Sequence, residues 1–326
     1  MKIQSILLTI FLLTAAFLSG CNTNSPNKKD QATNKNDDTI LTVFTTIYPI
    51  EDFTKRIGGK HVEVKSVYPA GADAHTFEPT MRTMMDIADA DLFIFNGAGL
   101  EPFIDKTKSS LANEKVTMVE ASNGIELLSG NDDHDEADHN DNKEEEQDHH
   151  HHGKDPHIWL DPVHAIKMAE NIKDALTEVM PSAEDDFEKN FIDVKQELEK
   201  LDKEFKKTVD SADHKEILVS HSSYGYWEHR YGLKQISISG LSPENEPSQK
   251  QLQTIIETAK KHNISYIIYD QNPVTKVADV VKKETETTPV TLHNLEYLTE
   301  NDIKNNEDYF TIMNKNIETL KKVLAK

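Results

Sequence analysis

Residues 182–210 read SAEDDFEKNFIDVKQELEKLDKEFKKTVD, a helical pattern without internal glycine or proline. Apolar residues recur at steps of three or four, the spacing of one helix face: Phe187, Phe191, Val194, Leu198, Leu201, Phe205 and Val209. Ser182 is the expected N-cap, with acidic residues in the first turn. Such a helix would be about 43 Å long at 1.5 Å per residue. We therefore expect a stiff connection over 181–211.

Short β-rich runs alternate with helical patterns on both sides of this helix. The expected strands are 41–48, 62–68, 91–96, 116–120, 216–220, 235–239, 265–270 and 290–292. The expected helices are 51–57, 80–90, 102–112, 251–262, 275–285 and 308–325. This alternation is typical of α/β units with a mainly parallel sheet. The sequence predicts an α/β protein with an N-terminal lobe over 40–180 and a C-terminal lobe over 212–326.

The N-terminus has the pattern of a secretory signal over residues 1–20. Lys2 precedes an apolar run over 6–18, which is too short to span a bilayer core of roughly 30 Å as a helix. Leu18-Ser19-Gly20-Cys21 resembles the bacterial lipobox. This resemblance implies a diacylglyceryl group with palmitate chains on the sulfur of Cys21. We expect a lipoprotein on the extracytoplasmic face of a Gram-positive cell membrane. Residues 21–39 are nearly free of apolar side chains and predict a flexible tether.

The net charge of −21 argues against a nucleic-acid partner, which would require a basic face. The charge is uneven, because residues 131–155 contain eleven acidic residues and two lysines. Six histidines lie in the same stretch: His134, His139, His149, His150, His151 and His152. With almost no apolar residues, the loop 130–153 is expected to be disordered without metal. Its imidazoles and carboxylates can hold metal ions loosely.

Four further positions follow predicted strands or loops at the same edge of their sheets. His75, His157 and His221 are three of them, and the segment 292–296 (LHNLE) is the fourth. Ligands of open α/β sheets bind beyond the carboxyl ends of the strands. Three imidazoles and a carboxylate suit a tetrahedral metal, zinc first.

Four motifs resemble those of the zinc-specific solute-binding lipoproteins of bacterial ABC transporters. They are HTFEPT (75–80), PHIWLDP (156–162), SHSSYGY (220–226) and SGLSPENEPS (239–248). The resemblance covers essentially the whole mature chain. It implies two (β/α)₄ lobes joined by one long rigid helix, with the metal in the cleft between them. It also implies a monomer that captures Zn²⁺ and delivers it to a membrane permease for zinc uptake.

The resemblance implies that three of the metal ligands are His75, His157 and His221. Manganese-binding members usually have a carboxylate at the third position, so His221 favours zinc. Glu296 is the favoured fourth ligand, with water or Asp270 as alternatives. Asp270 could instead hydrogen-bond to a ligand without touching the metal, or cap a loop. The His-rich loop could gather zinc, sense it, or be a solvated insertion.

Other functions stay open from sequence alone. They are a manganese-binding protein of the same family, an adhesin and, from another class, a zinc hydrolase. The chain contains no His-Glu-x-x-His motif, the zinc-protease signature. We therefore expect a binding protein and not an enzyme.

Overall fold

The computed structural model describes residues 39–130, 153–271 and 276–325. Cys21, the signal and tether, and the six loop histidines lie outside these residues. The strands are β1 (Leu41–Thr45), β2 (Val62–Ser66), β3 (Leu92–Phe95), β4 (Thr117–Glu120), β5 (Glu216–His221), β6 (Lys234–Ser239), β7 (Tyr266–Tyr269) and β8 (Thr288–Thr291). The helices are α2 (Tyr48–Gly58), α3 (Met81–Ala88), α4 (Ile104–Ser110), α5 (Pro162–Val179), α6 (Glu184–Asp210), α7 (Gly225–Tyr231), α8 (Gln249–Lys261), α9 (Lys276–Thr285), α10 (Glu300–Lys304) and α11 (Tyr309–Val323).

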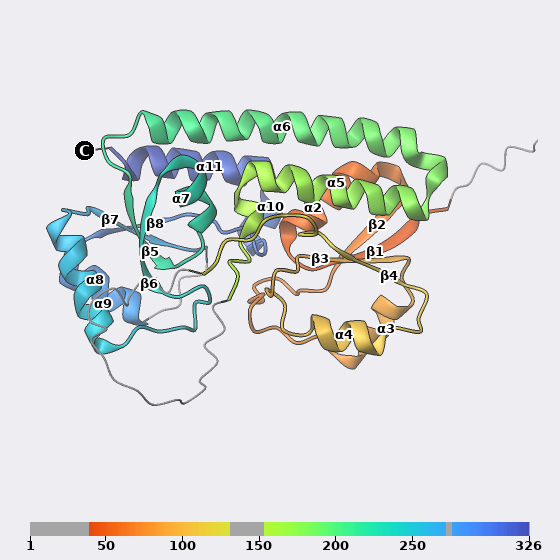
Figure 1. The fold of residues 1–326 in the computed structure, drawn as a ribbon, viewed down its shortest axis with the longest axis horizontal. Helices are drawn as coiled ribbons and strands as arrows, with labels where there is room; N and C mark the ends of the chain where they lie inside the picture. The colour runs from red at the N-terminus through yellow and green to blue at the C-terminus, as the bar shows by residue number, and fades with distance from the viewer. Residues whose placement is uncertain (1–38, 131–152, 272–275, 326) are drawn as a thin grey trace, which may run out of the picture. The chain divides into compact units, whose positions relative to one another are not determined.

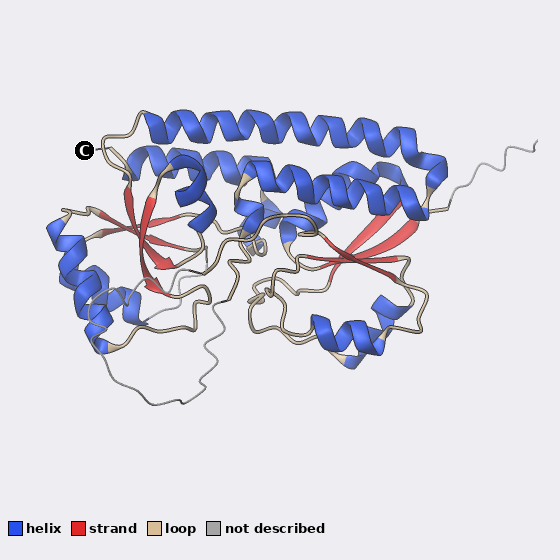
Figure 2. Ribbon diagram, viewed as in Figure 1, coloured by secondary structure: helices blue, strands red, loops and turns tan. Residues whose placement is uncertain are grey.

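The strands form two four-stranded sheets with the same topology. Their orders are β2-β1-β3-β4 and β6-β5-β7-β8, and every neighbouring pair is parallel. Helices cover both faces of each sheet (Figure 2). The predicted α/β class and parallel sheets are confirmed. In both sheets the strand order reverses beside the first strand, and ligands of such folds bind at that point.

The long helix α6 is confirmed and contacts helices from both halves of the chain. It packs against α2 and α5 and also against α7 and α11 (Figure 1). Its apolar face is buried as the spacing predicts, from Phe187 to Val209. At 27 residues it is about 40 Å long. The boundaries of the two lobes, at 180 and 212, stay a prediction.

The predicted start of α6 is wrong. Ser182 lies in a 3₁₀ turn over Pro181–Ala183, and the N-cap is Ala183, without a side-chain hydrogen bond. Proline fixes its own φ angle and favours such a tight turn at a helix start. Three acidic residues, Glu184, Asp185 and Asp186, then fill the first turn. Their charge complements the helix dipole, which compensates for the missing cap.

The first strand and helix also differ from the predicted ranges. The strand ends at Thr45 and not at 48, and α2 begins at Tyr48 and not at 51. Pro49 lies in the first turn of α2, where its missing N–H costs nothing. The helix α7 was not predicted, because GYWEHRY is short and rich in aromatic residues.

One hydrophobic core extends through both halves, and a smaller one lies under α8 and α9. Trp159 and Trp227 are fully buried in the shared core. Their indole N–H groups donate to the carbonyls of Asn294 and Leu160, each at 2.7 Å. Burying a large apolar side chain contributes about 1.5–3 kcal/mol. These contacts fix the segment after β8 against the loop before α5. Among the described residues, no helix has both the length and the apolar character needed to cross a membrane.

Candidate metal centre

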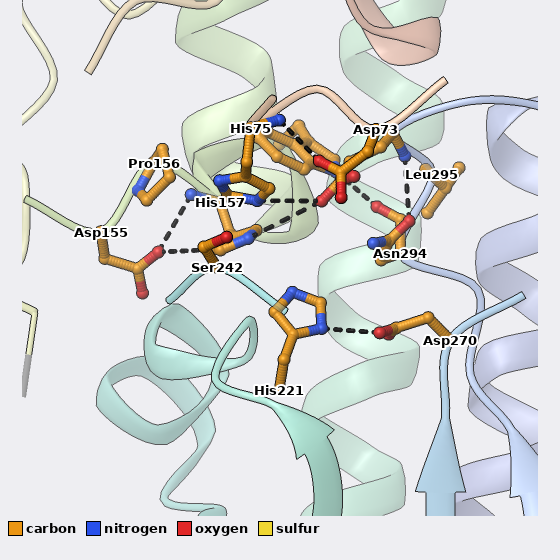
Figure 3. Close-up of polar contacts among 12 residues, drawn as sticks. Asp73, His75, Asp155, Pro156, His157, His221, Ser242, Asp270, Asn294 and Leu295 are labelled. Atoms are coloured by element: carbon orange, nitrogen blue, oxygen red, sulfur yellow. Dashed lines mark hydrogen bonds and ion pairs between the residues drawn. The ribbon is translucent and has the colours of Figure 1, made fainter. Parts of the chain in front are cut away.

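Four predicted side chains meet at the carboxyl-terminal edges of the two sheets. His75 comes from the loop after β2, His157 from the segment before α5, His221 from the end of β5 and Glu296 from the segment after β8. One ligand atom from each lies within 4.8 Å of the others. Figure 3 shows the three imidazoles turned toward one another. All four residues are largely or fully buried.

The facing atoms have no hydrogen-bond partner. They are Nε2 of the three histidines and Oε1 of Glu296, and each is buried. A buried polar atom left unsatisfied costs about 1–3 kcal/mol. Four such atoms pointing at one place are therefore a destabilising arrangement unless an ion fills it. No other group of three or more histidine, cysteine or acidic ligands occurs among the residues that the structure describes.

Carboxylates hold two of the imidazoles from behind. His157 Nδ1 lies 2.8 Å from Asp155 Oδ1, and His221 Nδ1 lies 2.6 Å from Asp270 Oδ2 (Figure 3). Each contact favours a proton on Nδ1, which leaves the Nε2 lone pair free for a metal. Asp270 also accepts a hydrogen bond from Ser220 Oγ at 3.2 Å. Its position is behind His221, outside the four converging residues.

Three of the four residues sit in the same local turn. The residue two positions earlier is Asp73, Asp155 or Asn294, and its side-chain oxygen accepts the backbone N–H of His75, His157 or Glu296. The N···O distances are 2.7, 3.0 and 3.1 Å. Asp and Asn favour such turns because their short side chains reach the backbone two residues on. These turns fix the direction of each side chain before any metal binds.

The segment that carries Glu296 is held more tightly still. Its carbonyl accepts the N–H of Tyr48 at 3.1 Å, and Asn294 exchanges two hydrogen bonds with the side chain of Gln271. Leu295 is buried and has a φ of 62°, the left-handed region that non-glycine residues rarely adopt. Such a conformation costs about 1–3 kcal/mol and persists where the surroundings enforce it. It turns Glu296 toward the histidines.

The pKa values of the site residues are shifted in different directions. Burial raises the pKa of Glu296, but the nearby His75, His221 and His157 outweigh it and hold the pKa at about 2. Burial lowers the pKa of His221, but Asp270 and then Glu296 outweigh it and raise the pKa to about 9. Burial also lowers the pKa of His157, and Asp155 does not reverse that shift. Without metal, a proton therefore resides on His221 opposite an ionised Glu296.

Sequence reasoning left some of these roles unassigned. Asp155 directly precedes the PHIWLDP motif, and its spacing to His157 repeats that of Asp73 to His75, a signal that could have identified it. His293, in the same candidate segment as Glu296, is not a free ligand. Its Nε2 lies 3.2 Å from Asp302, and its Nδ1 accepts the N–H of Leu295. Only Glu296 of that segment reaches the histidines.

Comparison with known proteins identifies the family of this chain. The sequence pattern of the family described as "zinc-uptake complex component A periplasmic" (ZnuA) matches residues 43–323. The chain belongs to the ZnuA family. It is 35% identical over 312 residues to the "high-affinity zinc uptake system protein ZnuA" of Bacillus subtilis, and the match covers 96% of each chain.

Two streptococcal proteins are also similar to this member of the ZnuA family. The "zinc-binding protein AdcA" of Streptococcus pyogenes serotype M3 is 38% identical over 283 residues, or 86% of this chain. The chain spans only about 55% of that relative's length. The crystal structure of the Zn(II)-bound ZnuA-like domain of Streptococcus pneumoniae AdcA matches with a TM-score of 0.73 at 33% identity. That match covers 87% of this chain and 99% of the other.

Proposed function

We propose that this protein binds one Zn²⁺ ion through His75, His157, His221 and Glu296 and delivers it to the permease of an ABC transporter. The observation that carries this proposal is the convergence of four buried, unpartnered ligand atoms. Family membership supports zinc uptake as the process, and the zinc-binding names of the relatives support the ion.

The donor set favours zinc over manganese. Three imidazole nitrogens and a carboxylate suit Zn²⁺ in tetrahedral geometry, whereas Mn²⁺ favours sites rich in oxygen ligands. His221 supplies a nitrogen and keeps its carboxylate neighbour, Asp270, on the far side of the ring. A carboxylate at that position would have made the site more suitable for manganese.

The same donor set supports capture and not catalysis. A catalytic zinc keeps a coordination position for water, with a general base close by. Here four protein atoms would complete a tetrahedral ion. We therefore propose a solute-binding protein without enzymatic activity, working as a monomer. Its location would be the extracytoplasmic face of a Gram-positive cell membrane, held by a lipid on Cys21. We also propose that the His-rich loop gathers zinc and passes it to His157. The position of the loop in the sequence, just before His157, supports this role.

Metal analysis and chelator competition on residues 22–326 test the proposed function. We expect one tightly bound zinc ion per chain, which an excess of Mn²⁺ does not displace. Cells lacking the gene should need more zinc in the medium, and the gene with His221→Ala should not restore growth. A tight site for manganese alone, or no tight site, would contradict the proposal.

The carboxylate behind His221 gives a second expected result. Asp270→Asn should lower zinc affinity about 10–100-fold, the usual effect of removing the partner of a metal-bound histidine. The substituted amide would keep the shape of the side chain but lose the charge that orients Nδ1–H. Asp105→Asn, a change at an exposed residue on α4, is the matched control. An affinity equal to that of the wild type would show that Asp270 has no part in holding the ligand.

A further inference from the structure

A cavity of about 520 Å³ is lined by Glu296 and by none of the three histidines. Its walls come from the start of α2, the end of β2 with the residues after it, and the segment after β8. Tyr68 and Glu296 both line it. Because Oε1 of Glu296 faces His75 and His157, at 3.4 and 3.8 Å, Oε2 is the oxygen available to a donor from the cavity side.

Tyr68 has a buried hydroxyl without a hydrogen-bond partner. Its ring packs edge-on against Phe77 and Phe103, with centroids 4.9 and 6.5 Å away. Burial raises the pKa of this hydroxyl, and Glu101, Glu296 and Asp73 raise it further through their charges. The hydroxyl therefore keeps its proton in the field of these three carboxylates, which makes it a donor. A buried phenol usually finds a partner.

Two of the three carboxylates are already engaged. Glu101 accepts hydrogen bonds from Thr46 Oγ1 and from the N–H groups of Asn96 and Gly97, at 2.7 to 3.0 Å. Asp73 accepts the N–H of His75. Glu296 differs from them, because its Oε1 is buried without a hydrogen-bond partner and lies nearest to His75 and His157. It is the carboxylate with the most room for the Tyr68 proton.

Three other donors on the cavity wall have partners elsewhere. Tyr48 Oη bonds to Asp52 Oδ1 and the Glu307 carbonyl, at 3.4 and 3.2 Å. Ser66 Oγ donates to the Thr46 carbonyl at 3.4 Å. Lys55 is paired with Glu51. Tyr68 differs from these three residues because its hydroxyl is buried and without a hydrogen-bond partner.

We propose that Tyr68 is a positioning residue that sets how Glu296 binds the metal. In the zinc-loaded protein its hydroxyl donates a hydrogen bond to a water molecule bound to Glu296 Oε2, and this leaves Oε1 alone for the ion. One carboxylate oxygen and three imidazole nitrogens then give four-coordinate, tetrahedral geometry. A Glu296 free to bind through both oxygens would raise the coordination number, which suits Mn²⁺ better than Zn²⁺. Tyr68 therefore favours zinc, an inference that rests on the proposed metal-binding function.

The test is Tyr68→Phe, which keeps the ring between Phe77 and Phe103 and removes only the hydroxyl. We expect zinc affinity to fall about tenfold, as for other groups behind metal ligands, and the preference for zinc over manganese to narrow by about the same factor. Cobalt(II) substituted into the site reports the geometry, because tetrahedral Co²⁺ absorbs visible light far more strongly than five- or six-coordinate Co²⁺. The cobalt absorption should weaken in Tyr68→Phe. Tyr231→Phe, which removes a hydroxyl bonded to Asp202 at 3.0 Å, is the control and should leave the spectrum and the metal preference unchanged.

The two proposals fail in different ways. Absence of a tight site in the wild type would contradict the proposed function. A tight zinc site in the wild type, with the same cobalt spectrum and metal preference in Tyr68→Phe, would overturn only the role of Tyr68. A purely structural role would lower the melting temperature and leave the spectrum unchanged, which also overturns it. A crystal structure of the zinc-loaded wild type gives an answer independent of the variant. The inference is contradicted if, in that structure, Tyr68 Oη lies beyond hydrogen-bond distance of Glu296 Oε2 and of every water bound to Oε2.

Discussion

His221→Ala is expected to lower zinc affinity by more than about 100-fold while the protein still folds. The change removes one of four ligands, so its effect should exceed the 10–100-fold that is typical for a group behind a ligand. The three remaining ligands would have to complete the ion's coordination with water. Competition titration against a chelator of known zinc affinity measures the change directly.

The same substitution at His157 should have an additional effect on stability. His157 is fully buried, and its Nδ1 is the side-chain partner of Asp155, which is itself buried. Removing the imidazole leaves that buried carboxylate with only the backbone N–H of residue 157 as donor and opens a cavity, at a cost of about 1–3 kcal/mol. His157→Ala should therefore lower both zinc affinity and the melting temperature of the metal-free protein. His221→Ala should affect the melting temperature less, since the Asp270 side chain is more exposed than that of Asp155 and keeps Ser220 as a donor.

His262→Ala is the matched control for both variants. His262 is partly exposed in the C-terminal half and pairs with Glu216 at 2.8 Å, away from the four converging residues. Its removal should leave zinc affinity unchanged. Equal zinc affinity in the wild type and His221→Ala would exclude the proposed site. A loss of affinity in His262→Ala as well would point to general instability.

The strand ends could be located from sequence because hydrophobic runs and their turn signals are local. Parallel strands place their carboxyl ends at one edge, so His75 and His221 were each expected at that edge of their own sheet. The family resemblance then implied that the two meet in the cleft between the lobes, although 146 positions separate them. The motif resemblance singled out the same four residues that the structure brings together. The α/β class followed from the alternation of strands and helices.

The remaining details depend on contacts between distant segments, which local patterns do not encode. Asp270 and Glu296 each follow a strand of the second sheet and are both carboxylates, so spacing alone could not separate their roles. The left-handed φ of Leu295 and the Tyr48 hydrogen bond turn Glu296 inward, whereas Asp270 meets Nδ1 of His221. The predicted N-cap of α6, Ser182, was wrong for a similar reason, since the 3₁₀ turn at Pro181 displaced the helix start.

Zinc affinity is expected to rise about tenfold per pH unit between pH 7 and pH 9. Asp270 and Glu296 outweigh the effect of burial and raise the pKa of His221 to about 9. The metal-free site therefore carries a proton on His221 below that pH. Zinc requires the neutral imidazole, so binding expels this proton. Proton and metal compete, and lowering the pH favours the metal-free form.

Two other ligands should not contribute to this slope. Glu296, with a pKa of about 2, stays ionised over the range, and the lowered pKa of His157 keeps it neutral. Competition titrations at pH 7, 8 and 9 give the slope. Calorimetry in buffers of different ionisation enthalpy counts the protons released, and at pH 7.5 we expect about one from His221. Asp270→Asn removes the charge that raises the pKa of His221, so its slope should be flatter above pH 7. A wild-type affinity independent of pH over this range would show that His221 is already neutral in the free protein, and that Asp270 orients the imidazole without holding its proton.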